Sequence, residues 1–454
     1  MPASVEKGCC ETESPCCEEG IIRDAGDCMV STCCPGPSKV EKGKYYPLGK
    51  RVPSFLNPYT LENGGVMLSY FDVGVAIYFL VAPLSYYLIS ELNVSSTAYS
   101  AYATLISLPW SLKFVFGLIS DMNPIYGYRR KSWLLLGWLA FSGFSFFLAS
   151  LGEPDLTYTA IFMFLMTVSY LQSDVCTDCL AVERARYETE VHKGSLQTSG
   201  YTIRAFGMLI GAICGTLLYN TSSWGWGLTV AQLFALNALI PLFGVVPGAW
   251  WLEELASNQP PQTLVQHLES VWKTLQLRAV WWPMIFIYSY SVFQIPNSAW
   301  TNFLVIALGF TDFELGLLTI AGCAIFWVGM IIYKSFFFET SWRTIYIVTG
   351  VIGAVFSVLQ VILILRLNVA WGIPDLYFAL GDTAIVTLMQ AVQAMPACIM
   401  VWFLSFFLPS CFALPNATAS TVSSLTHSTT FSYPVCHALP RRQRRSHLCP
   451  IDYD

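Results

Sequence analysis

The chain has 454 residues, of which 55% are hydrophobic, 15% are aromatic and only 12% are charged, whereas about 25% of the residues of an ordinary soluble domain are charged. A water-soluble fold of this size needs far more charge to cover its surface, so the mean hydropathy of +0.53 indicates that lipid surrounds most of the chain. The net charge of −5 by itself excludes no class of binding partner. The basic residues do not collect on one polar domain, however, and we therefore expect no nucleic-acid partner.

Residues 1–64 differ from the rest because they are polar and interrupted by proline and glycine. They show no signal-peptide pattern, and we expect a disordered, Cys-rich cytosolic tail in which the reducing compartment prevents disulfides. The paired cysteines could be acylated or bind a metal, but no histidine accompanies them and their spacing fits no zinc module, so we predict no metal site. Seven of the fifteen cysteines lie in this tail: Cys9, Cys10, Cys16, Cys17, Cys28, Cys33 and Cys34.

Apolar stretches long enough to cross a bilayer recur along the rest of the chain. A helix needs about 20 mostly apolar residues to cross the hydrocarbon core, and lipid offers an open backbone no hydrogen-bond partners. A polar loop, residues 253–279, follows the sixth stretch and divides a six-helix lobe, residues 65–252, from a second lobe of four helices, residues 280–403. This outline is typical of two-lobed transporters built from repeats. The ten predicted spans are about 65–90, 98–119, 132–151, 157–179, 199–219, 227–251, 280–306, 314–335, 343–365 and 376–403.

The distribution of basic residues predicts which span ends face the cytosol. With the N-terminus inside, the outside loops carry only one cation, Arg366, and the sequons at Asn93 and Asn220 fall outside, where glycosylation could occur. We therefore predict an integral, multi-pass membrane protein with a cytosolic N-terminus, in the plasma membrane or, as the alternative, in an organelle membrane. The inside segments between spans carry Arg129, Arg130, Lys131, Arg184, Arg186, Lys193, Lys273, Arg278, Lys334 and Arg343.

Five ionisable residues lie within the predicted spans of the first lobe, where each costs about 2.5–3.5 kcal/mol on insertion scales. Asp174 and Asp178 are four residues apart in span four and therefore share a helix face, and Lys113 and Arg204 are their natural partners. Either these charges pair only to hold helices together, with Arg204 snorkelling to the cytosolic interface, or they line a central cavity that binds an anionic substrate and carries a proton. The five residues are Asp72, Lys113, Asp174, Asp178 and Arg204.

Prolines and glycines in three spans indicate bends or close packing. Pro109 lies in span two and Pro296 in span seven, where proline removes a hydrogen bond of the helix. Gly207, Gly211 and Gly215 form a G-x-x-x-G-x-x-x-G pattern in span five, which permits close approach of another helix. This pattern predicts either static packing or a rocking interface. In the second lobe, acidic residues occur only near span edges, at Glu314 and Asp382.

Two motifs resemble those of known transporters. Gly117-Leu118-Ile119-Ser120-Asp121, followed by Gly127-Tyr128-Arg129-Arg130-Lys131, resembles the loop-2/3 signature of the major facilitator superfamily, G-x-x-x-D-x-x-G-[RK]-[RK], with residues 122–126 inserted between its halves. The wider stretch that contains this signature, LPWSLKFVFGLISDMNPIYGYRRKSWLLLGW, resembles the folate-biopterin transporter family. The stretch SDVCTDCLAVERAR at the end of span four resembles the same family. NVSSTAYSAYATLISLPWS extends this likeness, which covers about residues 65–400.

The resemblance implies an all-α, two-lobed helical bundle of the major facilitator type with twelve helices, import of folates or pterins, and coupling to protons. It makes the intramembrane charges the substrate-binding or proton-coupling residues, namely Lys113, Asp174, Asp178, Arg204 and Asp72. By motif position it assigns a gating role to the cytosolic loop through Gly117, Asp121, Gly127, Arg129 and Arg130. Folates carry glutamate carboxylates, which suit a cationic pocket, and a flat pterin ring could stack on Tyr78, Trp110, Phe114, Tyr170, Tyr288 or Trp300.

Residues 404–454 depart from the family pattern, which expects two further spans. The stretch is rich in serine, threonine and proline and ends in a basic run, and no part of it reaches the length of a span. We expect either a polar, disordered tail or an error of reading frame or splice junction near residues 401–409 that leaves ten helices. A ten-helix product could be unable to transport.

Transporters, membrane enzymes and nonconducting receptors compete as functional classes. An enzyme needs a convergent set of catalytic or metal-binding groups, but all five histidines lie in predicted loops or tails, and no G-x-x-x-x-G-K-[ST] loop indicates ATP hydrolysis. We therefore predict a monomeric, cofactor-free, non-enzymatic secondary transporter for folate, biopterin or a related pterin that works by alternating access as a proton symporter. The alternatives are a carrier of the same fold for another small organic ion, such as S-adenosylmethionine, and a truncated product that does not transport.

Overall fold

The protein folds as α-helices, as a chain surrounded by lipid must if its backbone groups are to be hydrogen-bonded. A computed structural model describes residues 57, 59–185, 195–220, 224–250, 252 and 254, six positions between 265 and 276, and residues 278–293, 298–337, 340–356 and 358–407. Within this part of the chain there is no strand, and an isolated bridge joins Ile125 to Tyr128. The prediction of an all-α membrane protein is confirmed.

The helices of the predicted first lobe follow one another with short connections. Three of the spans in this part consist of more than one helical element, namely α1 with α2 and η2, α3 with α4, and α9 with α10. In chain order they are α1 (Leu61–Tyr78), α2 (Val81–Tyr86), the π-helical segment η2 (Tyr87–Glu91), α3 (Ser96–Ser111), α4 (Lys113–Met122), α5 (Lys131–Ser150), α6 (Leu156–Ala185), α7 (Ser195–Leu218), α9 (Val230–Phe243) and α10 (Val245–Gly248).

The helices of the predicted second lobe are more often interrupted. In chain order they are α12 (Arg278–Phe293), α13 (Ser298–Asn302), the π-helical segment η4 (Phe303–Ala307), α14 (Asp312–Ile332), the π-helical segment η5 (Tyr333–Phe337), α15 (Trp342–Phe356), α16 (Val358–Ile364), α17 (Leu367–Ala370) and α18 (Asp375–Phe407).

These helices correspond to the ten predicted spans. In the described part of the chain, seven helical segments are long and apolar enough to cross a membrane, or eight if α3 and α4 form one bent span. They account for predicted spans one to six, eight and nine. The seventh coincides with α12, α13 and η4, with residues 294–297 outside the described ranges, and the tenth coincides with α18.

Polar side chains begin several of these helices. Thr229 and Gln232 form a reciprocal capping box at the start of α9, and Thr311 and Glu314 form another at the start of α14. Such pairs satisfy backbone N–H groups that the first helical turn leaves without partners. Glu314, predicted as a charge near a span edge, therefore serves as a helix cap.

The second span bends by 44° between α3 and α4. Pro109 lies in the last turn of α3, and the chain leaves the helix at Leu112, whose N–H donates to the Pro109 carbonyl at 3.0 Å. Proline disrupts the hydrogen-bond ladder of a helix and favours a bend at this place. The bend makes Lys113 the first residue of a new helix. Pro296, the other predicted bend, lies outside the described residues.

The glycine row of α7 packs against α1. A Cβ atom added to Gly207, Gly211 or Gly215 would lie 2.2, 2.6 or 2.1 Å from the carbonyl oxygens of Phe71, Val75 and Phe79, which is closer than real Cβ contacts allow. The row therefore joins two helices of the same predicted lobe. Of the two interpretations of this pattern, the structure favours close packing of α1 on α7.

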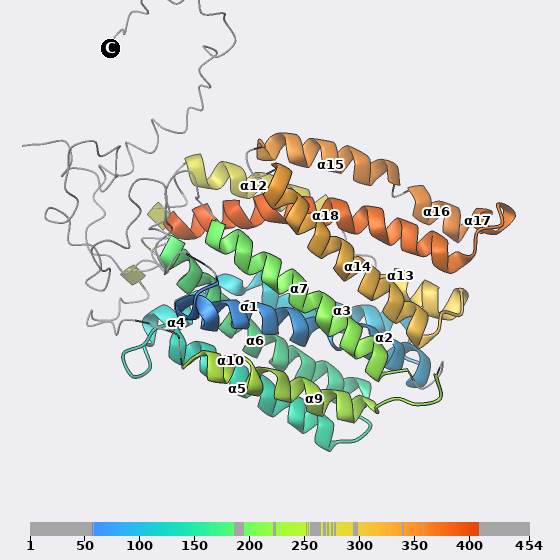
Figure 1. Ribbon diagram of the computed structural model, residues 1–454, viewed down its shortest axis with the longest axis horizontal. Helices are drawn as coiled ribbons and strands as arrows, with labels where there is room; N and C mark the ends of the chain where they lie inside the picture. The colour runs from blue at the N-terminus through green and yellow to red at the C-terminus, as the bar shows by residue number, and fades with distance from the viewer. Residues whose placement is uncertain are drawn as a thin grey trace, which may run out of the picture. The chain divides into compact units, whose positions relative to one another are not determined.

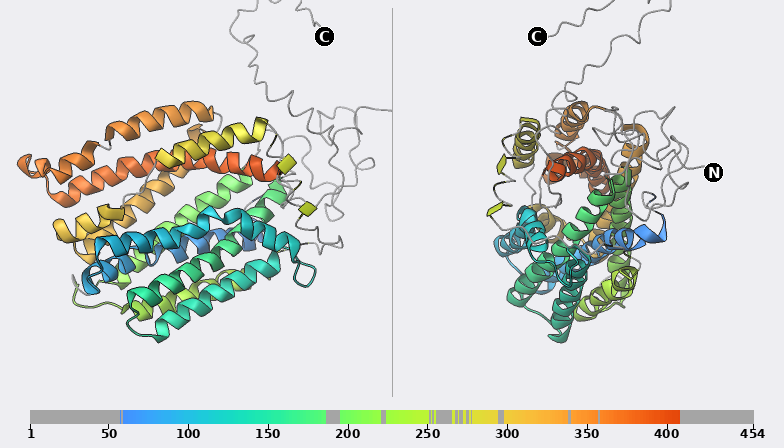
Figure 2. Two further views of the ribbon diagram at one scale, coloured as in Figure 1. Left: turned by 180° about the vertical axis from the view of Figure 1, so that it is seen from behind. Right: turned by 90° about the vertical axis from the view of Figure 1, so that its left-hand side faces the viewer.

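The helices of the two halves meet along α7 and α14. Figures 1 and 2 show the blue-to-green helices grouped on one side and the yellow-to-red helices on the other, with α14 lying against α7. Contacts between them include the rings of Phe206 and Trp327, with centroids 5.3 Å apart, and a hydrogen bond of 3.0 Å from Lys334 Nζ to Ser199 Oγ. All described residues belong to one unit, Asp24–Ala413.

Several features predicted from the sequence lie outside the described residues or differ from the prediction in the structure. The polar segments at residues 1–56 and 408–454, and the loop at 186–194, lie outside the described residues. Of the two predicted sequons, Asn93 is exposed, but Asn220 is fully buried. The folded protein therefore does not present the Asn220 amide for glycosylation.

Candidate functional site

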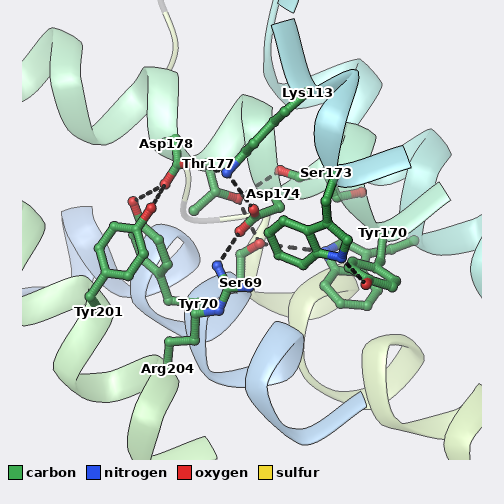
Figure 3. Close-up of polar contacts among 12 residues, drawn as sticks. Ser69, Tyr70, Lys113, Tyr170, Ser173, Asp174, Thr177, Asp178, Tyr201 and Arg204 are labelled. Atoms are coloured by element: carbon green, nitrogen blue, oxygen red, sulfur yellow. Dashed lines mark hydrogen bonds and ion pairs between the residues drawn. The ribbon is translucent and has the colours of Figure 1, made fainter. Parts of the chain in front are cut away.

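Four charged side chains meet where α4, α6 and α7 come together (Figure 3). α4 begins at Lys113 directly after the bend, α6 carries Asp174 and Asp178 one turn apart, and α7 supplies Arg204. These four residues form the charged cluster. They are four of the five intramembrane charges predicted from the sequence, and the structure brings them into direct contact.

The cluster is held by three short ion pairs. Lys113 Nζ lies 2.8 Å from Asp174 Oδ2 and 2.7 Å from Asp178 Oδ2, and the Arg204 guanidinium lies 3.0 Å from Asp174 Oδ1. Two cations thus face two carboxylates, and the formal charge of the cluster is zero. Desolvating ions costs several kcal/mol each, and only close geometry with additional hydrogen bonds offsets this cost.

The four members differ in their contact with solvent. The side chain of Asp174 is fully buried and that of Arg204 is 11% exposed, whereas Asp178 is 19% and Lys113 is 30% exposed. The cluster is therefore not sealed on all sides. Lys113 and Asp178 form its accessible edge, and Asp174 forms its closed interior.

Hydroxyl groups of α1 and α7 complete the environment of the acids. Tyr70 donates a hydrogen bond of 2.7 Å to Asp178 Oδ1, and Tyr201 reaches the same oxygen at 3.5 Å. Beside them, the hydroxyls of Ser69 and Thr177 are 2.7 Å apart. Nothing in the sequence separates Tyr70 or Tyr201 from the other tyrosines of the chain, so their place at the cluster could not be predicted.

An indole ring covers part of the cluster. Lys113 Nζ lies 5.6 Å and Arg204 Cζ 5.3 Å from the ring centroid of Trp110, within the range of cation–π attraction. The Trp110 Nε1–H donates to the Tyr170 hydroxyl at 3.1 Å. Of the aromatic residues proposed from the sequence for stacking, Trp110 and Tyr170 therefore lie at the cluster, whereas Phe114 and Tyr288 are 64% and 73% exposed, and Trp300 stacks on Phe303.

Asp72, the fifth predicted site residue, is buried apart from the cluster. Its Oδ2 accepts a hydrogen bond of 3.0 Å from the Val245 N–H, at the junction between α9 and α10. No cation of the described residues forms an ion pair with it. A carboxylate at the first N–H groups of a short helix acts as a cap. Asp72 of α1 therefore caps α10, which belongs to the sixth span.

The predicted gating loop forms a second charged centre, between α4 and α5. Arg130, only 2% exposed, lies 2.5 Å from Asp121 and 3.6 Å from Glu183, and it donates to Ser120 Oγ at 2.7 Å. Gly127 adopts a φ of +81° in the turn that precedes Arg130, a conformation that glycine adopts without strain. Gly117 faces α6 on the same helix as Asp121, where an added Cβ would lie 3.7 Å from Val175.

Glu254 ties this loop to the segment that follows α10. Its carboxylate accepts hydrogen bonds from the backbone N–H groups of Arg129 at 2.8 Å, Arg130 at 3.0 Å and Lys131 at 2.7 Å. The three N–H groups stand at the start of α5, where a negative charge is favourable. Sequence reasoning gave no role to Glu254, and it quoted Glu183 only within the family motif SDVCTDCLAVERAR, because the spacing of neither residue shows that it lies beside the α4–α5 loop.

No group of three or more histidine, cysteine or acidic side chains suited to a metal ion occurs in the described ranges. The paired cysteines of residues 9–34 lie outside them. The charged cluster instead offers cations and carboxylates next to an aromatic ring. The cluster thus brings together groups that can pair with charged and with flat aromatic parts of a small organic molecule.

Comparison with known proteins identifies relatives. A family model described as the BT1 family matches residues 73–405. The chain is 31% identical over 321 residues to the folate-biopterin transporter of Synechocystis sp., covering 70% of this chain and 63% of that protein. It is 29% identical over 219 residues to probable folate-biopterin transporter 4 of Arabidopsis thaliana, covering 46% and 42%, and 22% identical over 319 residues to folate transporter 1 of Plasmodium falciparum, covering 69% and 61%. The chain thus spans less than two thirds of the length of each of these relatives.

A solved structure also aligns with the chain. It is the crystal structure of a bacterial homologue of the iron transporter ferroportin in its outward-facing state, with a TM-score of 0.40, 12% sequence identity, and coverage of 82% of this chain and 89% of that one. At that TM-score the alignment does not establish a shared fold.

Proposed function

The chain belongs to the BT1 family, and from this premise we propose that it is a secondary transporter that moves folate, biopterin or a related pterin across a membrane. The relatives named above are transporters for folates or biopterin by name. The helices of the chain make it an integral, multi-pass membrane protein. Its orientation, with the N-terminus in the cytosol, and its place in the plasma membrane belong to the proposal.

One observation carries the proposal most directly, namely the contact of Lys113 with Asp174, Asp178 and Trp110 at a partly exposed place inside the bundle. A lysine that served only to pair with the two acids would need no surface open to a further ligand. Lys113 instead keeps 30% of its side chain accessible. It can therefore offer its ammonium group to a carboxylate of the substrate, while the neighbouring indole offers a ring face.

The proposed mechanism is alternating access coupled to protons. The two lobes rock about the charged cluster, and the α4–α5 loop, with its Asp121–Arg130 pair, locks the cytosolic side in one of the two states. With both acids ionised, the empty cluster is formally neutral, which permits reorientation without moving net charge through lipid. One proton that enters for each substrate carboxylate keeps the loaded carrier neutral too.

A carrier for another small organic ion is the alternative. S-adenosylmethionine carries a sulfonium group, which could lie against the accessible carboxylate of Asp178 and the ring of Trp110. Uptake of labelled folic acid, biopterin and S-adenosylmethionine by vesicles that contain the full chain distinguishes these substrates. Uptake of none of them by a chain delivered to the membrane would favour the truncated, non-transporting product.

Lys113→Ala tests the site within the same assay. We expect loss of folate uptake by roughly 10- to 100-fold, because a hydrogen-bonded charge pair contributes about 1.5–3 kcal/mol. Lys113→Arg, which keeps the charge, is the matched control and should retain part of the uptake. Membrane delivery is measured on the same vesicles by immunoblot. Folate uptake at the wild-type rate by Lys113→Ala would remove this residue from the site.

A further inference from the structure

The two acids of the charged cluster are not equivalent. We infer that Asp178, and not Asp174, is the acid that takes the transported proton, and that its protonation releases Lys113 to bind a carboxylate of the substrate. This inference rests on the proposed transport of an anionic pterin or folate. It assigns different roles to two residues that the sequence alone leaves interchangeable.

The pattern of cation contacts distinguishes the acids. Asp174 is paired on both oxygens, with Lys113 at Oδ2 and Arg204 at Oδ1. Among the described residues, Asp178 forms one ion pair, with Lys113 at Oδ2, and its Oδ1 accepts hydrogen bonds from the phenols of Tyr70 and Tyr201. Protonating Asp174 would leave two buried cations facing one carboxylate, whereas protonating Asp178 leaves Asp174 between both cations.

Access to water points to the same residue. Asp174 has no exposed surface, whereas Asp178 is 19% exposed and its partner Lys113 is 30% exposed. Asp178 therefore offers a proton an accessible surface that Asp174 lacks. Lys113, the partner of Asp178, lies at the same accessible edge of the cluster.

The ionisable groups that surround Asp178 complete the charge balance. They are Tyr70 on α1, Lys113 on α4, Asp174 on α6, and Tyr201 and Arg204 on α7. With both acids ionised, the two cations make the cluster neutral and leave it little attraction for an anion. One proton on Asp178 gives the cluster a charge of +1, and one substrate carboxylate returns it to zero.

The proposed step exchanges one hydrogen-bond partner of Lys113 for another. A proton from water forms an O–H bond at Asp178 Oδ2, and the contact of 2.7 Å between this oxygen and Lys113 Nζ is released. The ammonium group keeps its hydrogen bond to Asp174 and donates another to the substrate carboxylate in the vacated position. On the opposite side of the membrane, loss of the proton restores the Lys113–Asp178 pair and expels the substrate.

Asp178→Asn tests this assignment because it fixes a neutral side chain of the same shape. In liposomes that contain the full chain, we expect this variant to exchange labelled folate for unlabelled folate at all pH values, while it loses accumulation driven by a pH gradient. A pH-sensitive dye should detect proton movement with folate in the wild type and none in the variant. The matched control, Asp174→Asn one turn away, should lose exchange and accumulation together.

Two results would overturn the inference. One is gradient-driven accumulation by Asp178→Asn with the pH dependence of the wild type, and the other is the exchange-only behaviour appearing in Asp174→Asn instead. If Asp178→Asn is not delivered to the membrane, Tyr70→Phe removes only the phenol that donates to Asp178 Oδ1. That variant should still transport, with half-maximal uptake shifted by about one pH unit to higher pH, and an unchanged midpoint would contradict the inference. Failure of the wild type to take up folate would instead refute the proposed function.

Discussion

At the scale of single residues, the energetics of charge in lipid explain what the sequence could reveal. Lys113, Asp174, Asp178 and Arg204 were predicted as partners because an isolated charge in a span is expensive, and the structure joins them. Asp72 met the same criterion but contacts the backbone of Val245 instead. Hydropathy locates a charge along a span, but it does not show which neighbouring helix the side chain faces.

The Asp121–Arg130 pair allows a test of the loop at this scale. Asp121→Ala should lower the free energy of unfolding by about 3–5 kcal/mol, because it leaves the buried Arg130 without its closest carboxylate. The measurement is the melting temperature of the detergent-solubilised chain, together with its yield in membranes. Both partners are less than 5% exposed, so solvent cannot replace the lost charge.

An exposed pair of the same chain provides the control for this prediction. Lys273 and Glu269 are 70% and 60% exposed at a separation of 2.8 Å, and Lys273→Ala should change stability by at most about 1 kcal/mol. Equal melting temperatures for Asp121→Ala and Lys273→Ala would show that the buried pair does not stabilise the loop.

At the scale of elements, the sequence predicted helices well and their contacts poorly. The apolar stretches correspond to the observed helices because length and hydropathy alone decide whether a helix can span. The partner of the glycine row in α7 was left open, since G-x-x-x-G spacing shows that some helix comes close but not which one. The bend before Lys113 was anticipated at Pro109, yet its consequence, a new helix that begins at this lysine, needed coordinates.

The α1–α7 contact predicts a strong effect of a small substitution. Gly211→Ala should destabilise the protein by about 1–3 kcal/mol, because the added methyl would lie 2.6 Å from the Val75 carbonyl oxygen and force the helices apart. Gly143→Ala on α5 is the matched control, since nothing lies within 4 Å of its added methyl. Thermal unfolding in detergent measures both variants, and a Gly211→Ala protein as stable as Gly143→Ala would contradict the described packing.

At the scale of the whole molecule, the charged cluster lies among α1, α4, α6 and α7, while α14 of the second half packs on α7. Motion of the second half against the first would therefore act on the helix that carries Arg204 and Tyr201. The tails, which hold the paired cysteines and the basic C-terminal run, belong to the residues that the structure does not describe. The sequence could place the likeness to transporters in its motifs and could pair two cations with two acids, but the unequal burial of Asp174 and Asp178 emerged only from the fold.

The most direct test of the account is uptake by the purified full chain in liposomes with an alkaline interior. We predict that labelled folic acid accumulates inside, that uptake rises as the external pH falls, and that a protonophore abolishes the accumulation. The Lys113→Ala variant in the same liposomes should show no accumulation of folic acid, no rise of uptake at low external pH and no response to the protonophore. Folic acid that only equilibrates across the membrane, with no response to the pH gradient or to the protonophore, would contradict proton-coupled transport through the charged cluster.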